Sequence, residues 1–184
     1  MSTTTHFAGP VQSTNGFVGA VTGAITGNLT GNVTGNVTGA VLAVTPVNAT
    51  AATLTVTQAT HAGRVVTLNR ATGVTVTLPA AAGTGSVYVF EIGTTTSGGS
   101  QVIKVANSSD VINGFAHTIS DDAGAPMKGY KAAATDDTIT LNGTTTGGLL
   151  GDLVVITDVA TNIFHAQVMT ASTGTEATPF SATV

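Results

Sequence analysis

Cysteine and tryptophan are absent from this chain of 184 residues, and charged side chains are scarce. Without cysteine there is no disulfide bond and no thiolate zinc site. Aromatic residues make up only 4% of the chain, whereas Val, Ala and Ile supply most of an apolar fraction of 42%, a composition that favours pleated sheets. Charged residues reach 8%, against about 25% in ordinary soluble domains. We therefore expect an assembly to cover much of the surface.

The few charges form no run of either sign. Nine acidic and five basic residues give a net charge of −4, and no basic stripe with interleaved aromatic residues occurs, which argues against nucleic acid as a partner. The N-terminal stretch "MSTTTHFAGPVQ" has neither the basic nor the apolar region of a secretory signal. No apolar run approaches the roughly 20 residues that span a bilayer. We expect no membrane partner.

The most regular feature is a four-residue repeat over residues 17–41. An apolar residue recurs at every fourth position, a glycine follows two places later, and Thr alternates with Asn or Ala between them. Glycine at this frequency excludes a helix, because each costs about 1 kcal/mol relative to alanine. In an extended chain the apolar residues and glycines share one face, and Thr, Asn and Ala share the other. The apolar positions are Phe17, Val21, Ile25, Leu29, Val33, Val37 and Val41.

The repeat is not stable as an isolated strand. Burying its apolar side chains gives roughly 10–20 kcal/mol, whereas ordering about 25 residues costs on the order of 25–50 kcal/mol. We therefore predict that residues 1–45 form an extended arm. Its repeat associates with other copies, as a homotrimeric β rod, or lies along another protein. A flexible linker and a small solenoid are the alternatives that the pattern leaves open.

Pro46 begins a short linker at residues 46–52, and residues 53–184 are predicted to form a β body. Short alternating segments separated by Gly, Asn, Asp and Ser are typical of an antiparallel β-sandwich or barrel. The stretch "RATG" (70–73) is predicted to form a hairpin turn. The predicted strands are 53–57, 64–69, 74–79, 86–92, 101–106, 137–143, 152–159 and 162–169. The predicted core residues are Val74, Val76, Leu78, Tyr88, Phe90, Ile92, Phe115, Ile139, Leu141, Phe164 and Val168.

No constellation of side chains indicates catalysis. The four histidines are scattered, without metal-ligand spacing. The pairs Asp121–Asp122 and Asp136–Asp137 fall where turns are expected, so we assign them turn or cap roles, with a weak Ca²⁺ site as the alternative. The glycine-rich stretch "NGTTTGG" (142–148) lacks the lysine and the helix of a phosphate-binding loop. We expect no enzyme activity, no catalytic residue, no cofactor and no metal.

The repeat and the body resemble virion proteins of tailed bacteriophages. The Thr-Gly-Asn-Val repeat is similar to tracts in head-fibre and tail-fibre proteins. The segments "RVVTLNRATGVTVTLP", "DDTITLNGTTTGGLLGDLVVITDV" and "TGTEATPFSA" look like small virion proteins that resemble capsid decoration, or cement, proteins. The resemblance implies a homotrimer on the outer surface of the head, with the major capsid protein as its partner. It also implies synthesis in the cytoplasm of the infected cell.

These observations favour a capsid decoration protein whose β body bridges capsid subunits. We assign the contact between copies to the apolar positions of the repeat. Contact with the shell is assigned to "HFAGPV" (6–11) through Phe7, Pro10 and Val11, for which a disordered tail is the alternative. Two other functions stay open: a fibre or spike protein that binds a host-surface ligand through its body, and a secreted adhesin or surface-layer fragment.

Overall fold

The computed structural model describes residues 45–121, 123–124 and 127–184. The chain divides into two units, and these residues belong to the second, Leu42–Val184. Apart from Thr45, the predicted arm lies outside the described residues. This holds for Phe7, Pro10 and Val11 and for every apolar position of the repeat.

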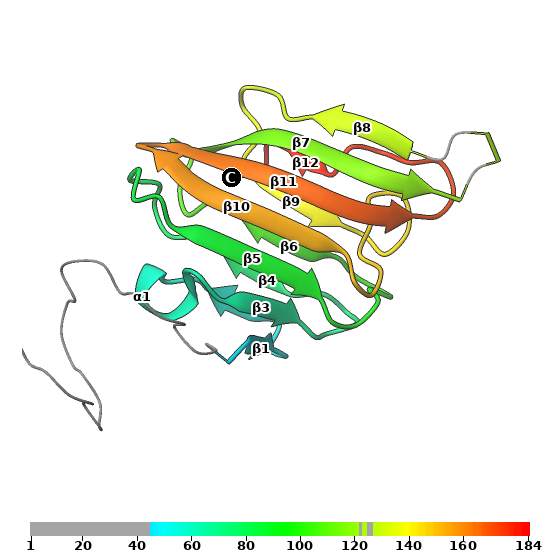
Figure 1. Ribbon diagram of the computed structural model, residues 1–184, viewed down its shortest axis with the longest axis horizontal. Helices are drawn as coiled ribbons and strands as arrows, with labels where there is room; N and C mark the ends of the chain where they lie inside the picture. Colours follow the sequence, from blue (N-terminus) through cyan, green and yellow to red (C-terminus); the bar gives the residue numbers. More distant parts are fainter. Residues whose placement is uncertain (1–44, 122, 125–126) are drawn as a thin grey trace, which may run out of the picture. The chain divides into compact units, whose positions relative to one another are not determined.

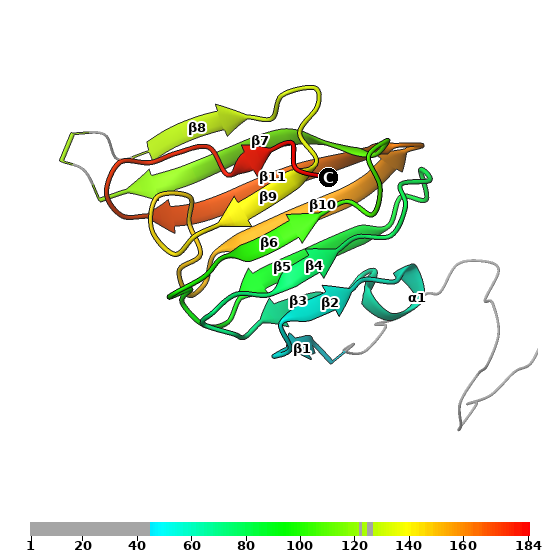
Figure 2. The same cartoon turned by 180° about the vertical axis from the view of Figure 1, so that it is seen from behind.

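The described residues form two sheets and one single-turn helix, α1 (Gln58–His61) (Figures 1 and 2). The seven-stranded sheet contains, in spatial order, β1 (Val47–Ala49), β3 (Val65–Leu68), β5 (Val87–Ile92), β10 (Leu153–Ala160), β11 (Ile163–Ser172), β7 (Val111–Ser120) and β8 (Met127–Lys131). The five-stranded sheet contains β12 (Phe180–Ser181), β9 (Thr138–Leu141), β6 (Gln101–Lys104), β4 (Thr75–Thr77) and β2 (Thr53–Thr55). The body is therefore all-β, as the sequence predicted. Within the described residues, no helix is long and apolar enough to cross a membrane.

The first six strands alternate between the two sheets. Strands β1, β3 and β5 are parallel neighbours in one sheet, and β2, β4 and β6 are parallel neighbours in the other. The chain thus makes three successive coils, each of which contributes one strand to each sheet. Later strands complete the sheets: β10 is antiparallel to both β5 and β11, β9 is antiparallel to β6, and β7 runs parallel to β11. Both sheets are mixed.

The prediction of an antiparallel sandwich is therefore only partly correct, and the predicted hairpin at residues 70–73 is wrong. The Gly73 N–H donates to the Arg70 carbonyl over 3.0 Å, so a turn forms there. However, β3 and β4 on its two sides belong to different sheets. Side chains alternate in the same way in parallel and antiparallel strands, so the sequence pattern does not distinguish a hairpin from a crossing between sheets.

A single apolar core lies between the two sheets. All of the predicted core residues except one are buried, and Tyr88, Phe90 and Phe164 are the largest side chains among them. The exception is Phe115, which is 40% exposed. On β7 the inward positions belong to Ile112 and Ala116, and strand alternation then places Phe115 on the outer side.

Each predicted strand segment contains or overlaps one observed strand, but four strands were not predicted. They are β1, β7, β8 and β12. Strand β1 lies within the segment 46–52 that the sequence suggested as a linker, and it pairs with β3 in the seven-stranded sheet. This segment is therefore built into the body.

Candidate interaction surface

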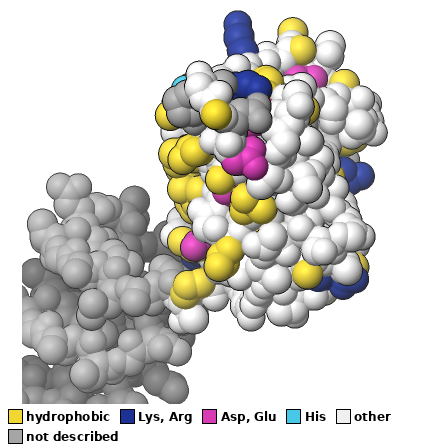
Figure 3. All heavy atoms as spheres, turned by 90° about the vertical axis from the view of Figure 1, so that its right-hand side faces the viewer, with side chains coloured by type: hydrophobic (Ala, Val, Ile, Leu, Met, Phe, Trp, Pro, Cys, Tyr) yellow, Lys and Arg dark blue, Asp and Glu magenta, His cyan; other side chains and the backbone are white. Residues whose placement is uncertain are grey.

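The outward-facing residues of the seven-stranded sheet form a largely apolar surface, which we call the apolar face. Successive side chains on a strand point to opposite sides, so the residues between the core positions face outward. Met127 is 62% exposed, Ile119 60% and Met169 47%, which is unusual for large apolar side chains close together on one surface. Figure 3 shows hydrophobic side chains gathered along the left side of that view. The apolar members are Val65, Val87, Val89, Val111, Phe115, Ile119, Met127, Leu153, Val155, Ile163, Met169 and Ala171.

The strand register arranges the centre of this face in two rows that run across five strands. One row contains Glu91, Leu153, Met169, His117 and Gly129, from β5 to β8. The neighbouring row contains Val89, Val155, Gln167, Phe115 and Lys131 on the same strands. Two residues along a strand separate the rows, which corresponds to about 7 Å. The middle of the face is thus apolar apart from one amide and one imidazole.

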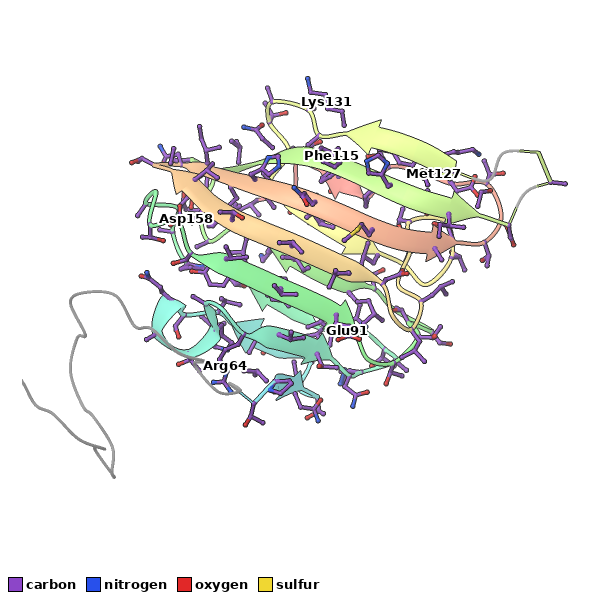
Figure 4. The ribbon with its side chains drawn as sticks, in the orientation of Figure 1. Arg64, Glu91, Phe115, Met127, Lys131 and Asp158 are labelled. Carbon is purple, nitrogen blue, oxygen red and sulfur yellow. The ribbon has the colours of Figure 1, made fainter. Side chains whose placement is uncertain are left out.

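Charge is confined to the ends of the two central rows. Among the outward-facing residues of the described strands in this sheet, only Glu91 and Lys131 are charged, and both are exposed. Figure 4 labels both residues, with Glu91 on β5 and Lys131 beyond β7 on β8. Neither has an ion-pair partner among the residues that the structure describes. Protein–protein interfaces commonly have few charged residues at the centre of the patch, as this face does.

Phe115 lies between two histidines on this face. Its ring centroid is 5.2 Å from that of His117 on the same strand and 6.1 Å from that of His165 on β11, both in edge-on geometry. The remaining described histidine, His61, is buried in α1, where its Nδ1 accepts the Thr57 N–H over 3.0 Å. Within the described residues, no group of three or more His, Asp or Glu side chains could hold a metal ion.

A groove of about 640 Å³ opens at one end of the apolar face. Its walls come from β7, β8 and β11 and from the loop before β10, and they are mainly apolar. Two methionines line it, and the flexible thioether side chain adapts to partners of different shape. The apolar side chains that line it are Ile119, Met127, Leu150, Met169 and Ala171. The groove therefore suits apolar side chains better than a charged or sugar-like ligand.

Asp152 fixes the loop that forms one wall of this groove. Its carboxylate accepts the backbone N–H groups of Gly148, Leu149 and Ala171 over 2.7, 3.0 and 2.9 Å. Burial raises the pKa of Asp152, and these hydrogen bonds offset only part of that effect. The loop presents Leu150 to solvent, where the side chain is 68% exposed. An exposed leucine on a fixed loop is a ready contact for another protein.

Asp158, near the other end of β10, holds the loop between β4 and β5. The carboxylate accepts the N–H groups of Ala82, Gly83 and Thr84 over 3.1, 2.7 and 3.0 Å, and the Thr84 hydroxyl over 2.7 Å. Burial alone would raise its pKa, but the hydrogen bonds outweigh burial and lower the pKa below the ordinary value. Together Asp152 and Asp158 secure both ends of β10, one of the strands of the two central rows.

The structure describes three of the four aspartates that the sequence singled out. Asp136 is half-buried and accepts the N–H of Ala133, a turn contact, whereas Asp137 is buried and accepts N–H groups of the last two residues, Thr183 and Val184. Asp121 accepts the N–H of Gly174. Asp122 lies outside the described residues. Asp137 thus ties the C-terminus to the body, a role that a turn assignment does not anticipate.

Sequence reasoning missed the apolar face, although a signal was present. In "VYVFEI" (87–92) the outward residues Val87 and Val89 are as apolar as their inward neighbours. A continuous apolar run is typical of a strand covered on both sides, whereas a strand with one solvent-exposed side alternates.

The role of Asp158 also had a signal in the sequence. A carboxylate within the apolar run "VVITDV" needs hydrogen-bond donors when the strand is buried.

Comparison with known proteins gives no match: neither a family model, nor a curated protein, nor a solved structure resembles the chain significantly. The functional argument therefore depends on the residues and surfaces of this chain.

Proposed function

We propose that the protein is a structural component of a bacteriophage head, a decoration or cement protein that stabilises the shell as a homotrimer. The observation that carries the proposal is the apolar face, on which only Glu91 and Lys131 are charged among the outward residues of the described strands. The sequence adds a second indication, since no charged residue occurs before Arg64. Covering the outward apolar area of a chain with so little charge by other proteins lowers the free energy.

The proposed mechanism is thermodynamic. A protein that binds the assembled shell but not its free subunits shifts the equilibrium toward the shell, and many copies multiply the effect. In this mechanism the repeat joins three copies, the segment with Phe7, Pro10 and Val11 contacts the major capsid protein, and the β body bridges neighbouring capsid subunits. No catalytic step and no cofactor is involved.

A fibre or spike protein that binds a host sugar is less well supported. Sugar sites commonly present an exposed aromatic ring beside polar groups. The chain has two tyrosines and no tryptophan. Tyr88 is only 1% exposed, and Tyr130 is partly buried against the core. The groove next to the apolar face is lined mainly by aliphatic and thioether side chains.

The proposal is tested by adding the purified full-length chain to heads prepared without it. We expect saturable binding to assembled heads, no binding to free capsid subunits, and a higher temperature of head disruption in the presence of the protein. Binding and disruption are followed by co-sedimentation and by light scattering during heating. Heads whose disruption temperature does not change at saturation would show that the protein is not a cement.

A further inference from the structure

We propose that a second copy of this chain covers the apolar face. The two seven-stranded sheets then pack face to face about a two-fold axis that runs along β11. The contact is separate from the three-fold association assigned to the repeat, and it does not depend on the role in a phage head. In an assembly with both contacts, it would join neighbouring trimers.

The charges at the ends of the two central rows indicate where the axis lies. The strand order β5-β10-β11-β7-β8 places β11 midway between Glu91 on β5 and Lys131 on β8. Each of these residues is two strand spacings from β11, or about 10 Å. Rotation by 180° about an axis along β11 exchanges the two ends of the central rows, so that β5 lies opposite β8 and β10 opposite β7. Glu91 of each copy then lies opposite Lys131 of the other, and the contact forms twice.

The two residues are in adjacent rows, since Lys131 pairs with Phe115 whereas Glu91 pairs with Leu153. The offset along the strand is about 7 Å, which a lysine side chain can bridge. Packed sheets are usually rotated by about 30° relative to each other because each is twisted, and a contact through a long side chain tolerates this rotation.

The same axis gives the centre of the face suitable neighbours. Residues of β11 lie on the axis, so Met169 and Gln167 each face their own counterpart in the second copy. Two glutamine amides can hydrogen-bond to each other, because each has both a donor and an acceptor. Val155 on β10 and Phe115 on β7 share a row on either side of Gln167, and the rotation places each opposite the other. The same rotation places Leu153 opposite His117, so mainly apolar groups meet at the centre, and the charges meet at the ends of the rows.

A two-fold axis at right angles to the strands fits less well. Such a rotation keeps each strand opposite its own counterpart, so β5 faces β5 and β8 faces β8. No position of this axis along the strands brings Glu91 opposite Lys131, whereas the axis along β11 pairs these opposite charges.

The chain has no cysteine, so a single introduced thiol reports which surfaces meet. We choose Met169→Cys, on the axis, and Thr53→Cys as the matched control, because Thr53 is exposed on the outer side of the five-stranded sheet. Stacked sheets lie about 10 Å apart, so a bifunctional maleimide that spans this distance is the suitable reagent. The full-length Met169→Cys chain should give a crosslinked dimer on a denaturing gel, well above the Thr53→Cys chain. Equal yields from both chains would overturn the proposal, since they would reflect only association through other segments.

Charge reversal in the Met169→Cys chain tests the axis. Glu91→Lys and Lys131→Glu each replace the two attractive charge pairs of the dimer with two repulsive pairs. We expect each variant to raise the dissociation constant of the dimer about tenfold. The chain with both reversals restores the opposite charges, so its dimer yield should return. Unfolding curves in urea check that every variant folds. Single reversals without effect, or a double reversal that stays as weak as the singles, would contradict the axis.

The identity of the partner is tested on assembled heads with the same chain. A dimer of the decoration chain is expected as the main product. If the Met169→Cys chain links to capsid protein instead of to itself, the apolar face belongs to the shell, and the two-fold contact is wrong. The dimer yield in solution is measured without heads. It can therefore refute the two-fold contact whether or not the protein is a component of a phage head.

Discussion

Asp158 illustrates how one residue can hold a loop in place, and replacing it is the first test. Asp158→Ala removes the acceptor for the N–H groups of Ala82, Gly83 and Thr84 and leaves these donors partly buried. We expect a loss of about 3 kcal/mol in the free energy of unfolding, measured by urea denaturation. Asp136→Ala is the matched control, because this half-buried aspartate accepts a single backbone N–H through a solvent-exposed hydrogen bond, and the loss should stay below about 1 kcal/mol. Equal losses for the two variants would contradict the role given to Asp158.

Glu176 leads to a prediction about acid. Hydrogen bonds from Lys128 and Ser120 lower the pKa of Glu176 from 4.5 to about 2. Since the pKa in the folded state is depressed, the contribution of Glu176 to stability is present above pH 4.5 and is lost as the pH falls toward 2. Glu176→Gln should therefore lower the urea midpoint at pH 5 and change it much less at pH 2. Asp121→Asn, at an exposed position, serves as the control. A deficit of Glu176→Gln that is the same at both pH values would show that the charge is not the cause.

At the scale of single elements, strand positions in most of the body followed from the sequence, but β7 did not. Its inward side carries Ile112, Gly114, Ala116 and Thr118, which are mostly small or polar, whereas its outward side carries large apolar residues such as Phe115. On this strand the exposed side is thus more hydrophobic than the buried side, the reverse of the usual pattern. If a second copy covers the outer side, as proposed, both sides are buried, and the alternation loses its meaning as an indicator of burial.

Gly114 allows β7 to lie against β11, and this is testable. Its φ is +143°, and a Cβ at this position would overlap the carbonyl oxygen of Ala166 on β11. Gly114→Ala must therefore move β7 or break the parallel pairing, and we expect a loss of at least about 2 kcal/mol in the free energy of unfolding. Gly129→Ala on β8 is the control, because its Cβ would meet nothing within 4 Å, and it should be neutral or slightly stabilising. Circular dichroism during heating measures both variants.

For the molecule as a whole, composition was more informative than any motif. The low charge led to the expectation of a covered surface, and the described body has an apolar face of the kind that this expectation needs. The location of the face was not predictable, because it depends on which strands are neighbours. Val155, Gln167 and Phe115 are far apart in the sequence and become adjacent only through the pairing of β10 with β11 and of β11 with β7. Pairing between distant strands, and the crossing of the first six between sheets, leave no local signal.

The predicted homotrimer requires its own test in the full-length chain. Leu29, Val33 and Val37 lie on the apolar side of the repeat if it is extended, and burial of three such groups gives about 5–9 kcal/mol per chain. Changing all three to Asp should therefore dissociate the trimer. Changing Thr30, Thr34 and Thr38 to Asp adds the same charge on the opposite side and should leave the trimer intact. Light scattering gives the mass of each variant, at concentrations low enough to suppress contact through the apolar face of the body. If both triple variants keep the trimer mass, or both lose it, the apolar side of the repeat is not what joins the copies.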